Sequence, residues 1–173
     1  MNSEIKGLDK INKIVNEFVS EFDLSAEMAN DFAYYYYEDL ITYSLIVSDL
    51  SSQLFMLNFK EIAPDIECDI FISSLLHEIG HSETIDLLEQ PEVLYCHNVK
   101  KELDALNKDA DTLETAYDIH KKYFNLPDER LATDWAINYM RNNVEKIKEF
   151  ESKMEIAMNE MLELNLDKLE VAV

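Results

Sequence analysis

The sequence predicts a mainly helical protein in a single domain. Apolar residues recur at intervals of three and four along most of the chain, which is the period of an amphipathic helix. The 173 residues include only 2 glycines and 3 prolines, so a turn-rich β-sandwich or a glycine-rich nucleotide-binding fold is disfavoured. Hydrophobic residues make up 47% of the chain, which is enough to build a core. We therefore expect residues 1–173 to form one domain.

Residues 1–62 are predicted to contain the N-terminal helices and a short ambiguous stretch. Residues 4–22 have the spacing of an amphipathic helix. Ser25 is a typical N-cap residue and Glu27 would complement the helix dipole, so a second helix is expected to start there and to reach residue 40. The β-branched and aromatic residues of 43–62 allow a small β-hairpin or short sheet, although a helix is also compatible with them.

The rest of the chain is predicted to be helical. Residues 66–88 form one helix that Pro91 ends, and residues 98–123 form one or two more. Pro127 suits the first turn of a further helix, and helical spacing continues to residue 168. A helix over 127–168 would have about 40 residues and a length of roughly 60 Å. It is expected to fold back, to pack on another helix, or to pair with a second chain as a homo-oligomer.

The charge of the chain disfavours several classes of partner. Fifteen Lys and Arg residues stand against 36 Asp and Glu, which gives a formal net charge of −21. Phosphate backbones and anionic membrane surfaces would repel such a protein. We therefore expect no nucleic-acid partner and no membrane partner, and a basic substrate is the more compatible one. The sequence shows no membrane-spanning run and no signal-peptide pattern, and its two cysteines fit reduced thiols, so a cytoplasmic location is expected.

One segment has the pattern of a metal site. Residues 77–81 read HEIGH, which matches the pattern HExxH. His77 and His81 are four residues apart on a helix, so both imidazoles can reach one metal ion. Glu78 is one step around the helix and can take a proton from water on the open side of the metal. Gly80 costs a helix about 1 kcal/mol relative to alanine, which suggests that another backbone approaches closely there.

A catalytic zinc ion usually has three protein ligands and leaves the fourth position to water. No histidine follows soon after His81, so the third ligand is expected to be a carboxylate. Glu129 is the best candidate, because Ala132 and Ala136 lie on the same helix face and would let that helix approach closely. The alternatives are Glu83, Asp86 and Asp134.

These motifs resemble those of the zincin-type metallopeptidases, in particular the ImmA/IrrE-like group encoded by bacteria, mobile elements and phages. That group has an HE-apolar-GH helix and then a helix that begins E-x-x-A-x-x-aromatic-A, which matches residues 129–136 here. The resemblance implies a zincin-like domain with two active-site helices, zinc bound by the two histidines and Glu129, and Glu78 as the catalytic base. Thr133 stands where the group commonly has Asn, and residues 82–126 form a longer insertion than in compact members.

The expected reaction is hydrolysis of a peptide bond in a protein or peptide substrate. Zn²⁺ lowers the pKa of its bound water, Glu78 accepts the proton, and the hydroxide attacks a carbonyl polarised by the metal. The oxyanion that forms needs a hydrogen-bond donor. Candidates for this donor are Tyr117, His120 and Tyr123. Carboxylates usually orient histidine ligands through the other ring nitrogen. Candidates for that role are Asp134 and Asp86.

A second class of function also fits the sequence. The charge of −21 and the long C-terminal helix are compatible with an acidic helical binding or inhibitor protein. Such a protein would sequester a basic partner or mimic DNA, and its metal site would be structural or vestigial. A hydrolase that acts on a carbonyl other than a peptide is a third, weaker alternative.

Overall fold

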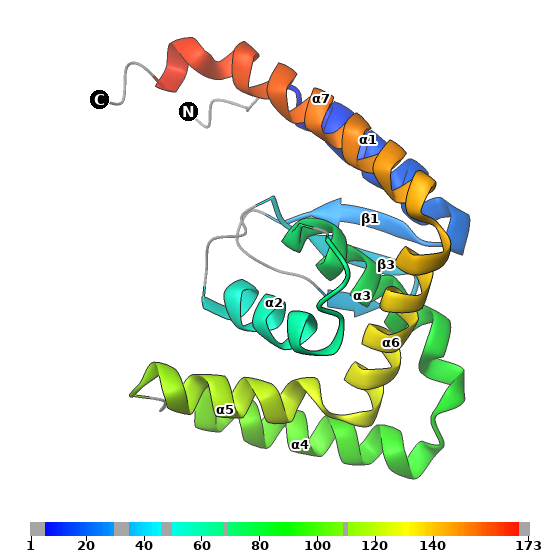
Figure 1. Ribbon diagram of the computed structural model, residues 1–173, viewed down its shortest axis with the longest axis vertical. Helices are drawn as coiled ribbons and strands as arrows, with labels where there is room; N and C mark the ends of the chain where they lie inside the picture. Colours follow the sequence, from blue (N-terminus) through cyan, green and yellow to red (C-terminus); the bar gives the residue numbers. More distant parts are fainter. Residues whose placement is uncertain (1–5, 30–34, 46–49, 68, 109–110, 170–173) are drawn as a thin grey trace.

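The computed structural model describes residues 6–29, 35–45, 50–67, 69–108 and 111–169 (Figure 1). This part of the chain contains seven α-helices and three β-strands, so the prediction of a mainly helical protein is confirmed. The helices are α1 (Leu8–Val19), α2 (Leu50–Ile62), α3 (Ile70–Thr84), α4 (Gln90–Lys108), α5 (Leu113–Phe124), α6 (Pro127–Asn142) and α7 (Val144–Leu169). The strands are β1 (Ser25–Met28), β2 (Tyr35–Tyr37) and β3 (Leu40–Tyr43).

The three strands form one small sheet in the order β1-β3-β2. Strand β1 pairs in parallel with β3, and β2 pairs antiparallel with β3. The predicted helix that starts at Ser25 is therefore wrong, because the strands lie at 25–28, 35–37 and 40–43. The physical reason is tertiary pairing: the amide side chain of Asn16 bonds both the N–H and the C=O of Ala26 at 2.8 Å, so β1 is paired on both sides. Of the two alternatives for 43–62, the structure has the helix, since α2 takes up 50–62.

Helix α3 lies at the centre of the molecule, and most of its side chains are buried. It starts later than the predicted residue 66, because the carboxylate of Asp69 accepts a hydrogen bond from the N–H of Ile72 at 2.8 Å and caps the helix there. It ends at Thr84, and a short 3₁₀-helix (Ile85–Leu87) follows. Pro91 does not end α3. It lies in the first turn of α4, where a proline needs no N–H partner.

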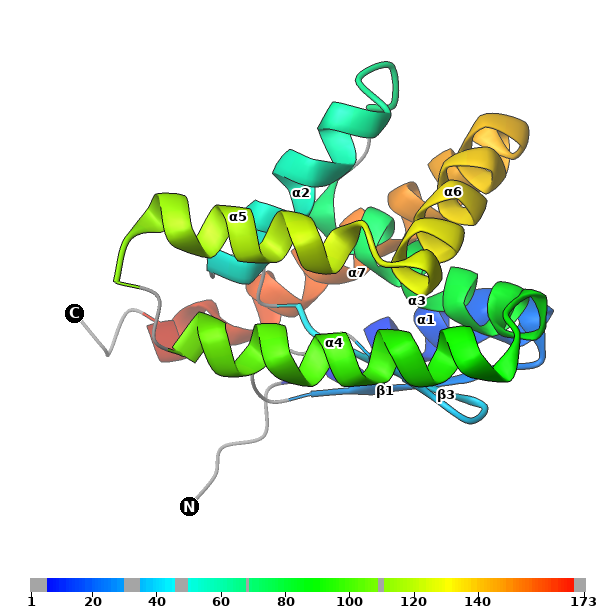
Figure 2. The same ribbon diagram turned by 90° about the horizontal axis from the view of Figure 1, so that it is seen from below.

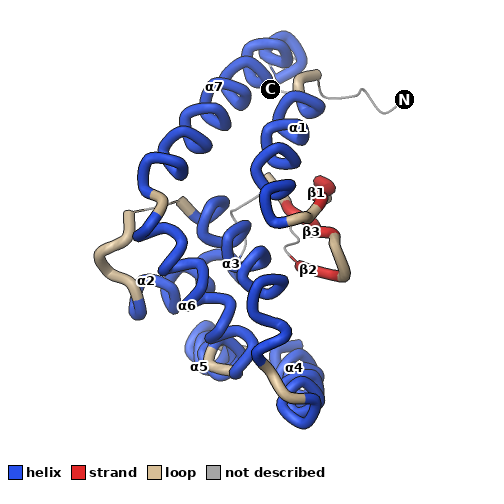
Figure 3. The backbone as a smooth tube through the Cα atoms, turned by 90° about the vertical axis from the view of Figure 1, so that its right-hand side faces the viewer, coloured by secondary structure: helices blue, strands red, loops and turns tan. Residues whose placement is uncertain are grey.

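The segment 127–168 is not one helix. It is divided at Asn143, whose backbone has φ −129° and ψ 36° and whose side-chain amide donates to Tyr139 O at 2.9 Å. Helix α7 therefore turns away and runs antiparallel to α1, as Figures 1 and 3 show. Phe18 stacks on Phe150 at 4.2 Å between ring centroids. The expectation that this segment packs on another helix is confirmed.

The α1–α7 pair forms one end of the molecule, and the α4–α5 hairpin forms the other, with α3 and the sheet between them (Figures 1 and 3). Helices α4 and α5 come from the insertion 82–126 and lie side by side (Figure 2). The prediction of one or two helices in 98–123 is resolved as two, with the first beginning at Gln90. Within the described ranges, no helix combines the length and the apolar character that crossing a bilayer requires.

Candidate metal centre

The close crossing of α3 and α6 creates the site. A Cβ atom placed on Gly80 would lie 2.4 Å from the carbonyl oxygen of Ala132, so only glycine allows the two backbones to come this near. Ala132 and Ala136 are fully buried at the same contact. The expectation that a second backbone packs against Gly80 is confirmed, and the first turn of α6 is thereby brought to the histidines of α3.

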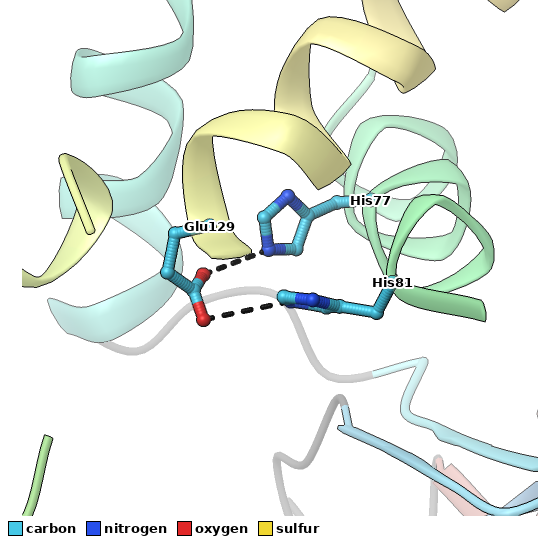
Figure 4. Close-up of side chains that lie close together, drawn as sticks. All are labelled: His77, His81 and Glu129. Atoms are coloured by element: carbon cyan, nitrogen blue, oxygen red, sulfur yellow. Dashed lines mark hydrogen bonds and ion pairs between the residues drawn. The ribbon is translucent and has the colours of Figure 1, made fainter. Parts of the chain in front are cut away.

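His77, His81 and Glu129 converge at this crossing, and one ligand atom from each lies within 4.8 Å of the others. His77 Nε2 is 3.0 Å from Glu129 Oε2, and His81 Nε2 is 3.5 Å from Glu129 Oε1 (Figure 4). Two imidazoles and one carboxylate are a donor set that Zn²⁺ and other divalent transition metals accept. The three side chains therefore form a candidate metal site. The alternatives Glu83, Asp86 and Asp134 are not in this group.

The charges of the site are strongly coupled. Burial alone would raise the pKa of Glu129, but hydrogen bonds from His77 and His81 hold that pKa well below its usual range. Burial would lower the pKa of His81, but its contact with Glu129 outweighs this effect and the pKa is raised. Burial raises the pKa of Glu78. The site therefore keeps Glu129 ionised, as a metal ligand has to be.

Thr133 contacts the ring nitrogen of His77 that Glu129 does not contact. Its hydroxyl lies 3.1 Å from His77 Nδ1, and the residue is fully buried. The partner of His77 Nδ1 is thus a hydroxyl and neither of the two candidate carboxylates: Asp134 pairs with Arg130 at the surface at 3.4 Å, and Asp86 is exposed. Thr133 follows Glu129 by four residues, so it lies one turn further along the face of α6 that meets α3. That spacing indicates the face on which Thr133 lies, but only the tertiary structure shows that it contacts His77.

Lys100 is a residue of the site that the sequence did not indicate. Its ammonium group forms an ion pair with Glu129 and a second one with Asp128 at 2.6 Å. It also lies 5.1 Å from the ring centroid of Tyr123. Burial opposes the charge of Lys100, but Glu129 and its neighbours raise the pKa above its usual range. No local pattern distinguishes this lysine on the highly charged helix α4, because only the folding of residues 82–126 brings it to Glu129.

The candidate metal site opens into a cavity of about 540 Å³. Helices α2, α3, α4 and α5 contribute to its walls, so the insertion 82–126 builds part of it. Its apolar lining consists of Phe55, Ile85, Leu103, Ile119 and Phe124. Glu78 lines the same cavity beside the two histidines. A volume of this size is typical of pockets that bind small molecules.

Of the three residues predicted as hydrogen-bond donors to an oxyanion, two line the cavity and one does not. His120 and Tyr123 line the cavity, whereas Tyr117 points away from it and donates to Glu61. Burial raises the pKa of Tyr123 above its usual range, so its hydroxyl stays protonated. His120 and Tyr123 are thus the two candidates that the fold leaves near the ligands.

Comparisons with known protein families, with curated proteins and with solved structures find no match. Any function has to be argued from the site itself. What the structure supplies is a mainly helical fold with a buried His77, His81 and Glu129 group at the floor of a cavity.

Proposed function

We propose that this protein is a zinc-dependent metallopeptidase of the zincin type, similar to the ImmA/IrrE-like group. The observation that carries the proposal is the convergence of His77 and His81 from α3 with Glu129 from α6. Its surroundings support it, since the group is buried on one side and faces a cavity on the other. A structural zinc site would more often be closed by a fourth protein ligand.

Each residue has a distinct task in the proposed reaction. A zinc ion held by the two histidines and Glu129 would polarise the scissile carbonyl and lower the pKa of a water molecule. Glu78 lines the cavity next to both histidines, where it accepts the proton of that water and passes it to the leaving amine. The apolar wall of the cavity holds the side chain beside the scissile bond, and the acidic surface favours substrates with basic residues.

The variant Glu78→Gln tests the catalytic part of the proposal. Protein reconstituted with zinc and cleared of excess metal should contain about one zinc ion per chain, in the wild type and in the variant, because Glu78 is not a ligand. Cleavage of a proteome-derived peptide library, followed by mass spectrometry, should fall at least about 100-fold in the variant. Glu83→Gln, an exposed residue of the same helix, is the matched control and should cleave normally.

A Glu78→Gln variant that cleaves as fast as the parent would contradict the catalytic role. If the wild type binds zinc but cleaves nothing in the library, the alternative of an acidic binding protein with a structural metal is favoured. Binding of a basic partner that survives chelation of the metal would support that alternative further. The expected cytoplasmic location and the homo-oligomer remain predictions.

A further inference from the structure

A buried hydrogen bond in the cavity wall sets the protonation of one histidine. Asn58 is on α2 and only 2% exposed, and its Nδ2 lies 2.8 Å from Leu54 O and 3.2 Å from His120 Nδ1. An amide oxygen in that position would face the carbonyl oxygen of Leu54, so the contact with Leu54 identifies the atom as the nitrogen. This nitrogen can only donate. His120 Nδ1 must therefore accept, and it carries no proton.

The proton of a neutral His120 is then on Nε2. Burial lowers the pKa of His120, and the opposing effect of Glu129 is smaller, so the ring is neutral near neutral pH. With Nδ1 accepting from Asn58, Nε2–H is the only N–H donor that the ring has left, and the residue lines the cavity. The imidazole is fixed in orientation as well as in tautomer.

Aromatic neighbours hold this ring within the site. His120 stacks on Phe124 and on Tyr123, each at 6.4 Å between ring centroids. Phe124 in turn stacks on His77 at 6.1 Å with an interplanar angle of 11°. One phenyl ring therefore connects the metal ligand to His120, and the two imidazoles keep a defined separation.

We propose that His120 is the catalytic residue that donates Nε2–H to the oxyanion of the tetrahedral intermediate, and that Asn58 is the positioning residue that selects this tautomer. This inference rests on the proposed peptidase function. A donor that is already oriented before reaction stabilises developing charge most effectively. The other donors meet this condition less well, because Lys100 is held by Glu129 and Asp128, and the hydroxyl of Tyr123 can rotate about its C–O bond.

Variants of His120 test the catalytic part. His120→Phe keeps an aromatic ring against Phe124 and Tyr123 but removes the donor. On the library peptide that the wild type cleaves fastest, its kcat/KM should fall about 100- to 1,000-fold while zinc content stays unchanged. His120→Gln retains an amide donor and should recover part of the rate. His97→Phe makes the same change at an exposed histidine of α4 and should have wild-type activity.

The role of Asn58 has a readout that does not depend on hydrolysis. Long-range ¹H–¹⁵N correlations of the zinc-loaded wild type should show His120 as the Nε2–H tautomer. Asn58→Leu removes the donor and Asn58→Asp replaces it with an acceptor of the same shape, so both should increase the Nδ1–H population. Their kcat should fall with little change in KM, whereas a merely structural role would not move the tautomer.

The outcomes separate this inference from the function on which it rests. His120→Phe with wild-type kcat/KM, in a protein whose Glu78→Gln variant is inactive, would overturn the inference and leave the peptidase proposal intact. An Nδ1–H tautomer in the wild type would overturn the role of Asn58. A zinc-loaded wild type that cleaves no peptide would overturn both proposals.

Discussion

Glu129 shows what a buried carboxylate requires from its surroundings. A carboxylate removed from water costs several kcal/mol unless it is paired, and here two imidazoles and the ammonium group of Lys100 compensate its charge. The pKa of Glu129 is depressed as a result. The carboxylate is therefore already ionised, and no proton has to leave it when a cation binds.

At the same scale, a substitution of Thr133 tests whether its hydroxyl orients His77. Thr133→Val has nearly the same shape but removes the hydroxyl that lies 3.1 Å from His77 Nδ1. The imidazole then loses the contact that orients it, and we expect the zinc affinity to fall about 10- to 100-fold. Competition with a chromophoric chelator measures this change. Thr115→Val, at an exposed position of α5, should bind zinc like the wild type, and equal affinity in both variants would contradict the orienting role.

At the scale of the elements, the close crossing of α3 and α6 requires a glycine at position 80. Gly80→Ala would gain about 1 kcal/mol of helix propensity. The added Cβ, however, would lie 2.4 Å from the carbonyl oxygen of Ala132, which is backbone and cannot rotate away. Overpacking of this kind costs about 1–3 kcal/mol or more, so the clash outweighs the propensity.

We therefore expect Gly80→Ala to unfold at a lower urea concentration and to bind zinc more weakly, because α6 must move away from α3. Urea titration and chelator competition measure the two effects. Ser82→Ala, also in α3, gains helix propensity without this clash and serves as the control. A Gly80→Ala variant that is more stable than the wild type would show that the two helices can separate without cost.

A second element-scale contact joins the segment that follows α2 to α6. Asp65 accepts hydrogen bonds from Arg141 at 2.8 Å and 3.2 Å, and this lowers the pKa of Asp65 from 3.8. A depressed carboxyl pKa stabilises the fold above the ordinary value, and the stabilisation is lost as pH falls through the lower folded-state value. Arg141→Met should therefore reduce the free energy of unfolding at neutral pH, and the difference from wild type should shrink below about pH 4. Urea titrations across this range measure it, and a constant difference would contradict the assignment.

At the scale of the whole molecule, the metal and the fold should be linked. The three ligands come from two helices, so an unfolded chain does not hold them together and zinc favours the folded state. At a free zinc concentration about 100 times Kd, the added stability is about 2.7 kcal/mol. A chelator should therefore lower the unfolding temperature of the wild type. It should have little effect on Glu129→Gln, and an equal effect on both proteins would contradict binding at this site.

Local patterns predicted a large part of the molecule. Helical periodicity identified α1 and the helical part of the insertion, and Pro127 marked the start of α6. The spacing within HExxH placed two imidazoles on one helix face, and Gly80 indicated a close neighbour. These predictions succeed because they depend on residues within a turn or two of each other, where helix geometry decides the outcome.

The predictions that failed depend on distant segments. Ser25 has the chemistry of a helix cap, but it pairs with β3, and the next residue, Ala26, is hydrogen-bonded to Asn16, so both lie in a strand. Asn143 interrupts a spacing that would otherwise continue, and α7 turns to cover α1. In both cases contacts with distant segments, the pairing of β1 with β3 and the packing of α7 on α1, outweigh a local preference of less than a few kcal/mol.

The sequence by itself determined the helical class and the pair His77 and His81, because a one-turn repeat is readable from spacing. It ranked Glu129 first among the candidate carboxylates from its small-residue helix face, and the structure selected Glu129. Only the tertiary structure decided what surrounds them: Lys100 against Glu129, Thr133 behind His77, and Asn58 against His120. Each of these contacts joins two different helices. Their geometry follows from how the helices pack, which no local pattern specifies.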